Sequence, residues 1–341
     1  MSQNAHVVAG GLTRDLAEGY RTMASDVDNL LRGVASSTRD ALAGGCVLTI
    51  GNFDGIHTGH SAIVAEVVER SRQAGLPAAA LTFEPHPVVF FRSMAPESFR
   101  VTTSAARARR LKELGIDHVI TLPFDAQLAQ LDAERFVDEV VLHGLHARRV
   151  HVGHDFHFGK GRLGTPEMLR ARCEAEGVPV HVQEAILLGG APISSTRIRS
   201  ALREGDMAAA RELLGAPYEM TGVVQAGAGR GGEIGVPTLN IYPEDTLLPP
   251  RGVYATRALV DGRWQDAISN LGTRPSFDDG DRVSFETMLL EPITGRRDGE
   301  TLRVALLAWI RGERRFSTPS ALKEQIALDL EQARRAHRLR S

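Results

Sequence analysis

The sequence predicts an α/β domain built on a parallel sheet, followed by a small antiparallel β-structure and a closing helix. Three observations favour this fold class. Strand-like apolar segments alternate with helical ones from Cys46 to about residue 200. Short strands separated by glycine and proline turns then run from about Pro217 to Ile310. The length of 341 residues suits two domains of ordinary size.

Composition narrows the class of protein. Lysine and arginine number 40 against 42 aspartates and glutamates, so we expect no nucleic-acid partner. No apolar segment is long enough to cross a bilayer and no secretory signal is present, which favours a cytoplasmic protein without a membrane partner. Cys46 and Cys173 lack a CxxC partner, so we interpret them as reduced thiols. Self-association stays open.

An N-terminal extension, residues 1–45, precedes the first strand. Apolar residues recur at helical spacing from Leu12 to Val34, and Gly44-Gly45 ends the pattern. We expect this segment to pack on the first domain; a dimerisation helix is the alternative.

The elements of the first domain follow in an alternating order. The predicted strands are Val47–Ile50, Ala78–Phe83, His118–Thr121, Arg149–Gly153 and Pro179–Val182, and the predicted helices are Ser61–Ala74, Ala105–Leu114 and Ala133–Leu142. Such alternation is typical of a parallel sheet covered by helices on both faces.

The second half changes character. An Asp261-Gly262 turn between Tyr254–Val260 and Arg263–Ile268 predicts a hairpin. The last helix begins with Thr318 as its cap and Pro319 in its first turn. Together with the short strands, these signals predict a small antiparallel barrel or sandwich with a C-terminal helix.

Two histidines follow the first strand directly. His57 and His60 lie three residues apart, after a turn that contains Gly51 and Gly55 and around Gly59. If a helix begins here, both imidazoles lie beside its first turn, where unpaired N–H groups and the helix dipole attract phosphate. Two imidazoles there can stabilise charge on a phosphoryl group during transfer. The alternative, surface turn histidines, is disfavoured by the pairing.

These residues resemble the HxGH motif of nucleotidylyltransferases, and the wider chain resembles bacterial bifunctional riboflavin kinase/FAD synthetases. The segments that carry the wider resemblance are Thr82–Pro87, Val152–Gly159 and Ile193–Arg199 in the first half, and Pro237–Asn240, Asn270–Phe277, Phe285–Thr287 and Arg311–Phe316 in the second. The resemblance extends from Cys46 to about Arg334. It implies a doubly wound domain at residues 46–200, a linker at 201–216 and a six-stranded riboflavin kinase-like barrel at 217–341.

For the first half, the resemblance implies adenylyl transfer from ATP to FMN. His57 and His60 would hold ATP phosphates with the surrounding turn, and Asp155 would lie near the reacting groups. The other implied residues are Gly51, Asn52, Phe53, Gly55 and Gly59 in the turn, Ser194, Ser195, Thr196 and Arg199 in a second phosphate-binding group, and Phe83 and Phe158 at the flavin. Helix capping by Ser194–Thr196 and core packing of Phe83 are the alternatives.

For the second half, the resemblance implies phosphorylation of riboflavin. Thr238 and Asn240 would bind Mg²⁺, for which hydroxyl and amide oxygens are suitable ligands. Glu286 would be the general base. The sequence departs from the family pattern in the glycine-rich segment before Pro237, at Leu239 and Met288, and at Glu291–Asp298.

The whole sequence thus predicts an enzyme that converts riboflavin to FMN and FMN to FAD with ATP and Mg²⁺. The departures leave two alternatives: an FAD synthetase with a degenerate kinase half, or a relative that acts on a modified flavin. A sensor that binds flavin or nucleotide without catalysis is a third, which the paired histidines disfavour.

Overall fold

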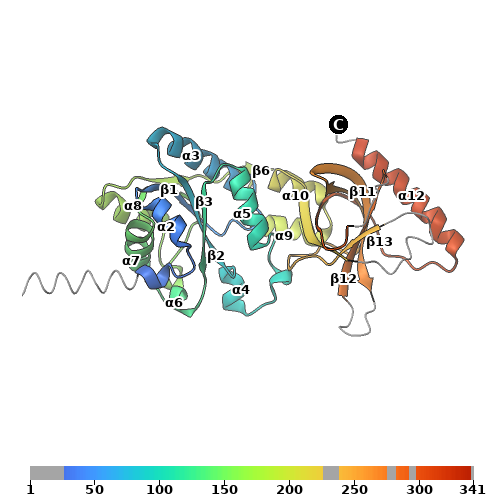
Figure 1. The fold of residues 1–341 in the computed structure, drawn as a ribbon, viewed down its shortest axis with the longest axis horizontal. Helices are drawn as coiled ribbons and strands as arrows, with labels where there is room; N and C mark the ends of the chain where they lie inside the picture. The colour runs from blue at the N-terminus through green and yellow to red at the C-terminus, as the bar shows by residue number, and fades with distance from the viewer. Residues whose placement is uncertain (1–26, 226–237, 275–281, 292–296, 339–341) are drawn as a thin grey trace, which may run out of the picture. The chain divides into compact units, whose positions relative to one another are not determined.

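The computed structural model describes residues 27–225, 238–274, 282–291 and 297–338. The chain forms two compact units (Figure 1). Among the described residues, the first comprises those up to Ser93 together with Ser104–Ile186, and the second comprises Met94–Thr103 together with Leu187 onward. The segment predicted as a linker, 201–216, contains the end of one helix and all of another. In the part of the chain that is described, no helix meets the length and hydropathy needed to cross a bilayer.

A five-stranded parallel sheet in the order β3-β2-β1-β4-β5 forms the centre of the first unit. Its strands are β1 Cys46–Ile50, β2 Ala78–Glu84, β3 His118–Pro123, β4 Ala147–Gly153 and β5 Val180–Gln183. Its helices are α2 Ser36–Leu42, α3 Thr58–Ala74, α4 Pro87–Arg92, α5 Ser104–Glu113, α6 Ala126–Ala129, α7 Ala133–Arg135, the π-helix η2 Phe136–Gly144, the 3₁₀ turn η3 Lys160–Arg162 and α8 Pro166–Ala175. The prediction of a parallel α/β sheet is confirmed.

Alternate residues of β1 pack against different helices, as the two-residue period of a strand requires. Val47 packs in a cluster with Val64 of α3 and Leu111 of α5. Leu48 packs in a second cluster with Val140 of η2 and Leu169 of α8. The sheet is therefore covered on both faces, which explains why β1 is buried at every position.

The N-terminal extension is described only from residue 27. Leu30 and Leu31 are buried in the core of the first unit, and Val34 packs against it. The packing prediction is confirmed for these residues, and residues 12–26 lie outside the described part.

The second unit is a closed antiparallel barrel in the order β10-β11-β12-β9-β8-β13, which confirms the predicted barrel. Its elements are the 3₁₀ turn η1 Pro96–Ser98, the short pair β6 Leu187–Leu188 and β7 Ala191–Pro192, α9 Ser195–Glu204, α10 Met207–Leu214, β8 Tyr218–Gln225, β9 Thr238–Ile241, β10 Gly252–Val260, β11 Arg263–Arg274, β12 Arg282–Leu289, β13 Thr301–Gly312 and α12 Pro319–Arg338. Inside the barrel, three buried hydroxyls satisfy one another: Ser269 Oγ lies 2.8 Å from Thr256 Oγ1 and 2.9 Å from Thr287 Oγ1.

Helix α12 covers one outer face of the barrel. Its residues Leu330 and Ala333 pack with Val253 and Ile268 from the strands. A nearly buried ion pair fixes the helix, because Arg311 of β13 donates to both oxygens of Asp329, with its Nη2 2.7 Å from Oδ2. The predicted cap is present: Thr318 Oγ1 accepts from Ala321 N at 3.2 Å.

We expect the Asp329→Ala substitution to lower the free energy of unfolding of the second unit by about 3 kcal/mol, because it leaves the Arg311 guanidinium without its carboxylate. Both tryptophans, Trp264 and Trp309, belong to this unit, so urea unfolding can be followed by their fluorescence. The control is Glu331→Ala, which removes an exposed pair with Arg335 and should cost less than about 1 kcal/mol. Equal losses in the two variants would contradict the role given to the buried pair.

The central sheet of the first unit contains a buried histidine. His151 of β4 is 1% exposed, and neither of its ring nitrogens has a hydrogen-bond partner among the described residues. Burial lowers its pKa from 6.5 to about 4, with a further lowering by His181. The folded chain therefore keeps this imidazole neutral at pH values where the unfolded chain binds a proton.

Because the unfolded state binds more protons between about pH 6.5 and 4, the free energy of unfolding should fall as the pH falls through that window. Over this range we expect the free energy of unfolding of His151→Leu to fall by about 2 kcal/mol less than that of the native chain. The measurement is urea unfolding followed by far-UV circular dichroism, with the exposed His143→Gln as control. Parallel pH curves for native chain and His151→Leu would refute this account.

Candidate active sites

The first site lies at the carboxyl edge of the parallel sheet. Strand β1 pairs with β2 on one side and with β4 on the other, so the connections from β1 and β4 leave the sheet in opposite directions. Ligands of doubly wound sheets bind at this point, where the strand order reverses. The turn after β1 carries His57, and the segment after β4 carries Asp155.

The two histidines lie face to face at the start of α3. His57 is the N-cap of this helix, and its Nδ1 accepts a hydrogen bond from His60 N at 3.2 Å. The two rings stack with centroids 3.7 Å apart and an interplanar angle of 14°. The edge of Phe53 meets His60, with 5.2 Å between centroids. Because Nδ1 of His57 is an acceptor, the proton of the neutral ring is on Nε2, which can donate to a ligand.

The turn depends on unusual backbone conformations. Phe53 and Ile56 have φ values of 49° and 39°, which residues other than glycine rarely adopt, and Gly55 has a φ of 91°. A Cβ at Gly59 would lie 3.0 Å from His57 Nδ1, so a larger residue would push the His57 ring aside. The predicted turn residues are therefore brought together, with strain that is consistent with a binding site.

Burial keeps both imidazoles neutral. It lowers the pKa of His57 to about 4, although the nearby Asp155 and Asp54 carboxylates act in the opposite direction. Burial, and then the adjacent His57, hold the pKa of His60 well below its usual range. Before a phosphate binds, these rings are hydrogen-bonding dipoles, not cations. His60 Nδ1 has no hydrogen-bond partner among the described residues, so it can form a hydrogen bond when a ligand binds.

The predicted flavin residues are largely covered. Phe83 is 8% exposed and Phe158 is 6% exposed, and both belong to the main core cluster. They are part of a row of aromatic rings that runs through Phe124 to Phe91, which is 62% exposed. Core packing is therefore present for both residues, and the exposed end of the row lies at Phe91.

The second set of predicted phosphate-binding residues, at the start of α9, belongs to the second unit. Ser194 is the N-cap of α9, since its Oγ accepts from Arg197 N at 3.4 Å, so the capping interpretation is confirmed for this residue. Ser195 and Thr196 lie in the first turn of α9. Arg199 is 6% exposed; its Nε donates to the Phe99 carbonyl at 2.8 Å, and its guanidinium lies 3.7 Å above the Phe99 ring.

The predicted kinase residues meet on one face of the barrel. Glu286 of β12 pairs in register with Asn240 of β9 and with Asn270 of β11. Neighbouring residues at two-residue spacing, Ile268 and Met288, pack under α12, so this row lies on the outer face. Asn240 is 5% exposed, and its Nδ2 lies 3.3 Å from the Thr238 carbonyl.

Sequence analysis did not single out Glu313, which the structure brings to the same face. A Cβ at Gly272 would collide with Oε1 of Glu313 and would lie 3.2 Å from Asn270 Nδ2. The glycine therefore makes room for a second carboxylate beside the row. The glycine-rich segment before Pro237 and residues 292–296 fall outside the described part.

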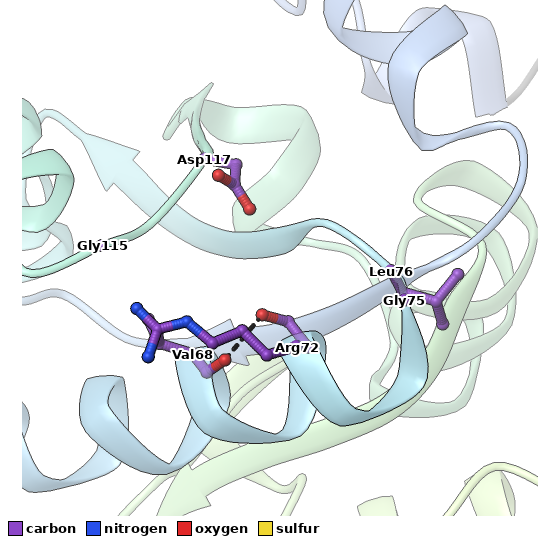
Figure 2. A pocket seen from close by; sticks show the side chains of 7 residues that line it. Val68, Arg72, Gly75, Leu76, Gly115 and Asp117 are labelled. Carbon is purple, nitrogen blue, oxygen red and sulfur yellow. Dashed lines mark hydrogen bonds between the residues drawn. The ribbon is translucent and has the colours of Figure 1, made fainter.

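A cavity of about 410 Å³ lies elsewhere in the first unit, between the end of α3 and the segment before β3 (Figure 2). Its lining includes Arg72 and Asp117, and Asp117 accepts from Ala78 N at 2.8 Å. Asp117 directly precedes β3 and Ala78 begins β2, so the cavity lies at the amino end of the sheet, opposite to His57. None of the predicted site residues lines it.

Sequence analysis also missed Arg107 of α5, which contacts the turn after β1. It is 1% exposed, whereas Arg109 and Arg110 on the same helix are 36% and 43% exposed. The available signal was periodicity: Arg107 is four residues before the buried Leu111, so both lie on the core-facing side of the helix.

Comparison with known proteins gives a consistent result. The FAD synthetase family model matches residues 40–197, and the riboflavin kinase family model matches residues 214–337. Two curated relatives are described as bifunctional riboflavin kinase/FMN adenylyltransferases. The one from Pseudomonas fluorescens is 36% identical over 85% of this chain and 92% of its own length, and the one from Escherichia coli K12 is 37% identical over 88% and 95%.

A solved structure described as a macrolide-efflux protein from Streptococcus pneumoniae is 30% identical. It covers 85% of this chain and 94% of its own, with a TM-score of 0.76. The two family models cover both compact units, and the curated relatives match along nearly their whole length. The chain belongs to the family of bifunctional riboflavin kinase/FMN adenylyltransferases.

Proposed function

We propose that this chain carries out the two reactions of its family at two separate groups of residues. As a family member it phosphorylates riboflavin to FMN and adenylylates FMN to FAD, which decides against the single-activity and sensor alternatives. The observation that supports the adenylyl assignment is the stacked pair of neutral histidines at the start of α3.

In the adenylyl reaction, an FMN phosphate oxygen attacks the α-phosphorus of ATP and pyrophosphate leaves. Nε2–H of His57 donates to an α-phosphate oxygen, and the start of α3 adds the field of its backbone dipoles. Gly51, Asn52 and Gly55 shape the turn that receives the phosphates. His57 thus acts as a neutral hydrogen-bond donor, because burial lowers its pKa to about 4 and its Nδ1 already accepts from His60 N.

Two further groups complete this proposal. The start of α9, with Ser194, Ser195 and Thr196, is a second phosphate-binding group, and Arg199 lies in the same helix. Asp155 orients groups near the reacting phosphates. Phe83 and Phe158 lie beneath the surface. They support flavin binding through contacts with neighbouring phenylalanine rings, in a row that ends at the exposed Phe91.

In the kinase reaction, Glu286 accepts the proton of the terminal ribityl hydroxyl as its oxygen attacks the γ-phosphorus of ATP. The Asn240 amide and the Thr238 hydroxyl are uncharged oxygen donors next to this carboxylate, a donor set that fits Mg²⁺. Bound there, Mg²⁺ would neutralise phosphate charge.

We also propose that the enzyme works in a reducing, cytoplasmic setting. Burial raises the pKa of the Cys46 thiol to about 12 and that of Cys173 to about 11, so neither forms a reactive thiolate near neutral pH.

We expect His57→Ala and His60→Ala each to lower kcat/KM for FAD formation from FMN by about 100-fold or more, because each removes a preorganised group at the phosphate. The measurement is pyrophosphate release with FMN and ATP supplied. Riboflavin phosphorylation by the same preparations serves as the control. It should stay within about twofold of the native rate, since the proposed kinase residues lie in the second unit. Unchanged FAD formation in either variant would sink the adenylyl assignment.

Glu286→Gln should lower kcat for riboflavin phosphorylation by about 100-fold, because the isosteric amide cannot accept the proton. Conversion of supplied FMN to FAD should be unaffected in this variant. The exposed Glu291→Gln, two residues after the end of β12, is the matched control and should keep both activities. If riboflavin remains unphosphorylated by the native chain but a modified flavin is accepted, the substrate assignment is wrong while the site assignment stands.

A further inference from the structure

The Arg107 guanidinium is buried beneath the adenylyl site and contacts two chain segments that are far apart in the sequence. Its Nη1 donates to the Asn52 carbonyl at 3.4 Å. Its Nη2 donates to the Phe83 carbonyl at 3.2 Å and to Glu84 Oε2 at 2.9 Å. One planar group thus joins the turn after β1 to the end of β2.

The first arm leads to the histidines. Asn52 precedes Phe53, whose positive φ directs the chain into the turn and whose ring meets His60 edge-on. The Asn52 carbonyl also accepts from Thr82 Oγ1 at 3.2 Å. Two buried donors, Thr82 and Arg107, therefore converge on one oxygen and fix where the phosphate-receiving turn begins.

The second arm leads to the aromatic row. Phe83 packs against Phe124 and Phe136, with ring centroids 6.0 Å and 6.4 Å away. Arg107 holds the carbonyl of this residue and the carboxylate of the next one. A shift of the guanidinium would therefore move the backbone on both sides of the site at once.

Stability alone does not account for this arrangement. Removing an arginine from water has a large desolvation cost, and replacing buried ion pairs with apolar residues is often neutral or stabilising. Among the described residues, Arg107 has one carboxylate partner, Glu84, and its Nε has no partner. Three hydrogen bonds of 2.9–3.4 Å to two segments of the proposed site are better explained by alignment of those segments.

We infer that Arg107 is a positioning residue for adenylyl transfer, which aligns the phosphate-receiving turn with the flavin-facing end of β2. The inference rests on the adenylyl site proposed above. Arg107 itself touches no reacting atom. Its effect is on the relative placement of two groups that must meet for reaction, and displacements of about 1 Å at such positions can cost about 100-fold in rate.

The test uses the full chain and steady-state FAD formation from FMN and ATP, with kcat and KM measured separately. Arg107→Lys keeps the charge but replaces the planar fork with a single ammonium, and we expect kcat to fall about tenfold. Arg107→Met should lower kcat about 100-fold. KM for both substrates should change less than threefold, and riboflavin phosphorylation should stay within about twofold.

Two further variants sharpen the result. Arg110 on the same helix pairs with the exposed Glu113, so Arg110→Lys should leave FAD formation unchanged. Thr82→Val removes the other donor to the Asn52 carbonyl. Because the two donors share that oxygen, the rate losses of Thr82→Val and Arg107→Lys should not multiply in the double variant.

FAD formation within twofold of the native rate in both Arg107→Lys and Arg107→Met would overturn the inference. So would full activity of Arg107→Lys combined with unfolding of Arg107→Met, since that result means a purely structural role. His57→Ala separates this failure from failure of the site itself: if His57→Ala is inactive while Arg107→Lys is fully active, the site stands and only the inference falls.

Discussion

The proposed adenylyl site depends on the parallel pairing of β1 with β4. This pairing places β1 at the centre of the sheet, where side chains of both faces are buried, and creates the reversal of strand order at its carboxyl end. The turn after β1 is consequently held at a rigid edge while its own backbone adopts unfavourable conformations at Phe53 and Ile56. The sheet holds the strained turn in place, and the two histidines stack directly after it.

Burial serves the chemistry of this site and also limits its stability. Burial lowers the pKa of His57 to about 4, so its neutral ring can donate from Nε2 to a phosphate while Nδ1 accepts from His60 N. The same neutrality makes the folded state bind fewer protons than the unfolded state in mild acid. His151 adds to that effect, and no hydrogen bond or ring contact among the described residues joins it to the proposed site, so acid sensitivity originates partly outside that site.

The barrel separates its interior from its reactive face by the period of its strands. Phe285 and Leu289 point inward with Leu271, whereas Glu286 lies on the outer row with Asn240 and Asn270. The interior hydroxyls of Thr256, Ser269 and Thr287 satisfy one another, so they place no demand on that row. The departures at Leu239 and Met288 are consistent with this division: Leu239 packs with the interior cluster and Met288 packs under α12. Neither substitution changes the donor atoms of Thr238, Asn240 or Glu286.

Much of this fold could be predicted because short sequence patterns determine its main strands, turns and helices. The strand, glycine turn and His-x-Gly-His sequence predicted the site at β1, and the Asp-Gly turn predicted the β10–β11 hairpin. What could not be predicted depends on contacts between distant segments. Arg107 stands in a run of arginines that local composition marks as solvated, and only the packing of α5 on the sheet buries one of them. Arg199 was predicted as a site residue, but its hydrogen bond to the Phe99 carbonyl, 100 residues away, could not be predicted from a local pattern. Sequence motifs therefore locate the residues proposed to act on substrates, whereas Arg107, proposed to align them, emerges only from the tertiary structure.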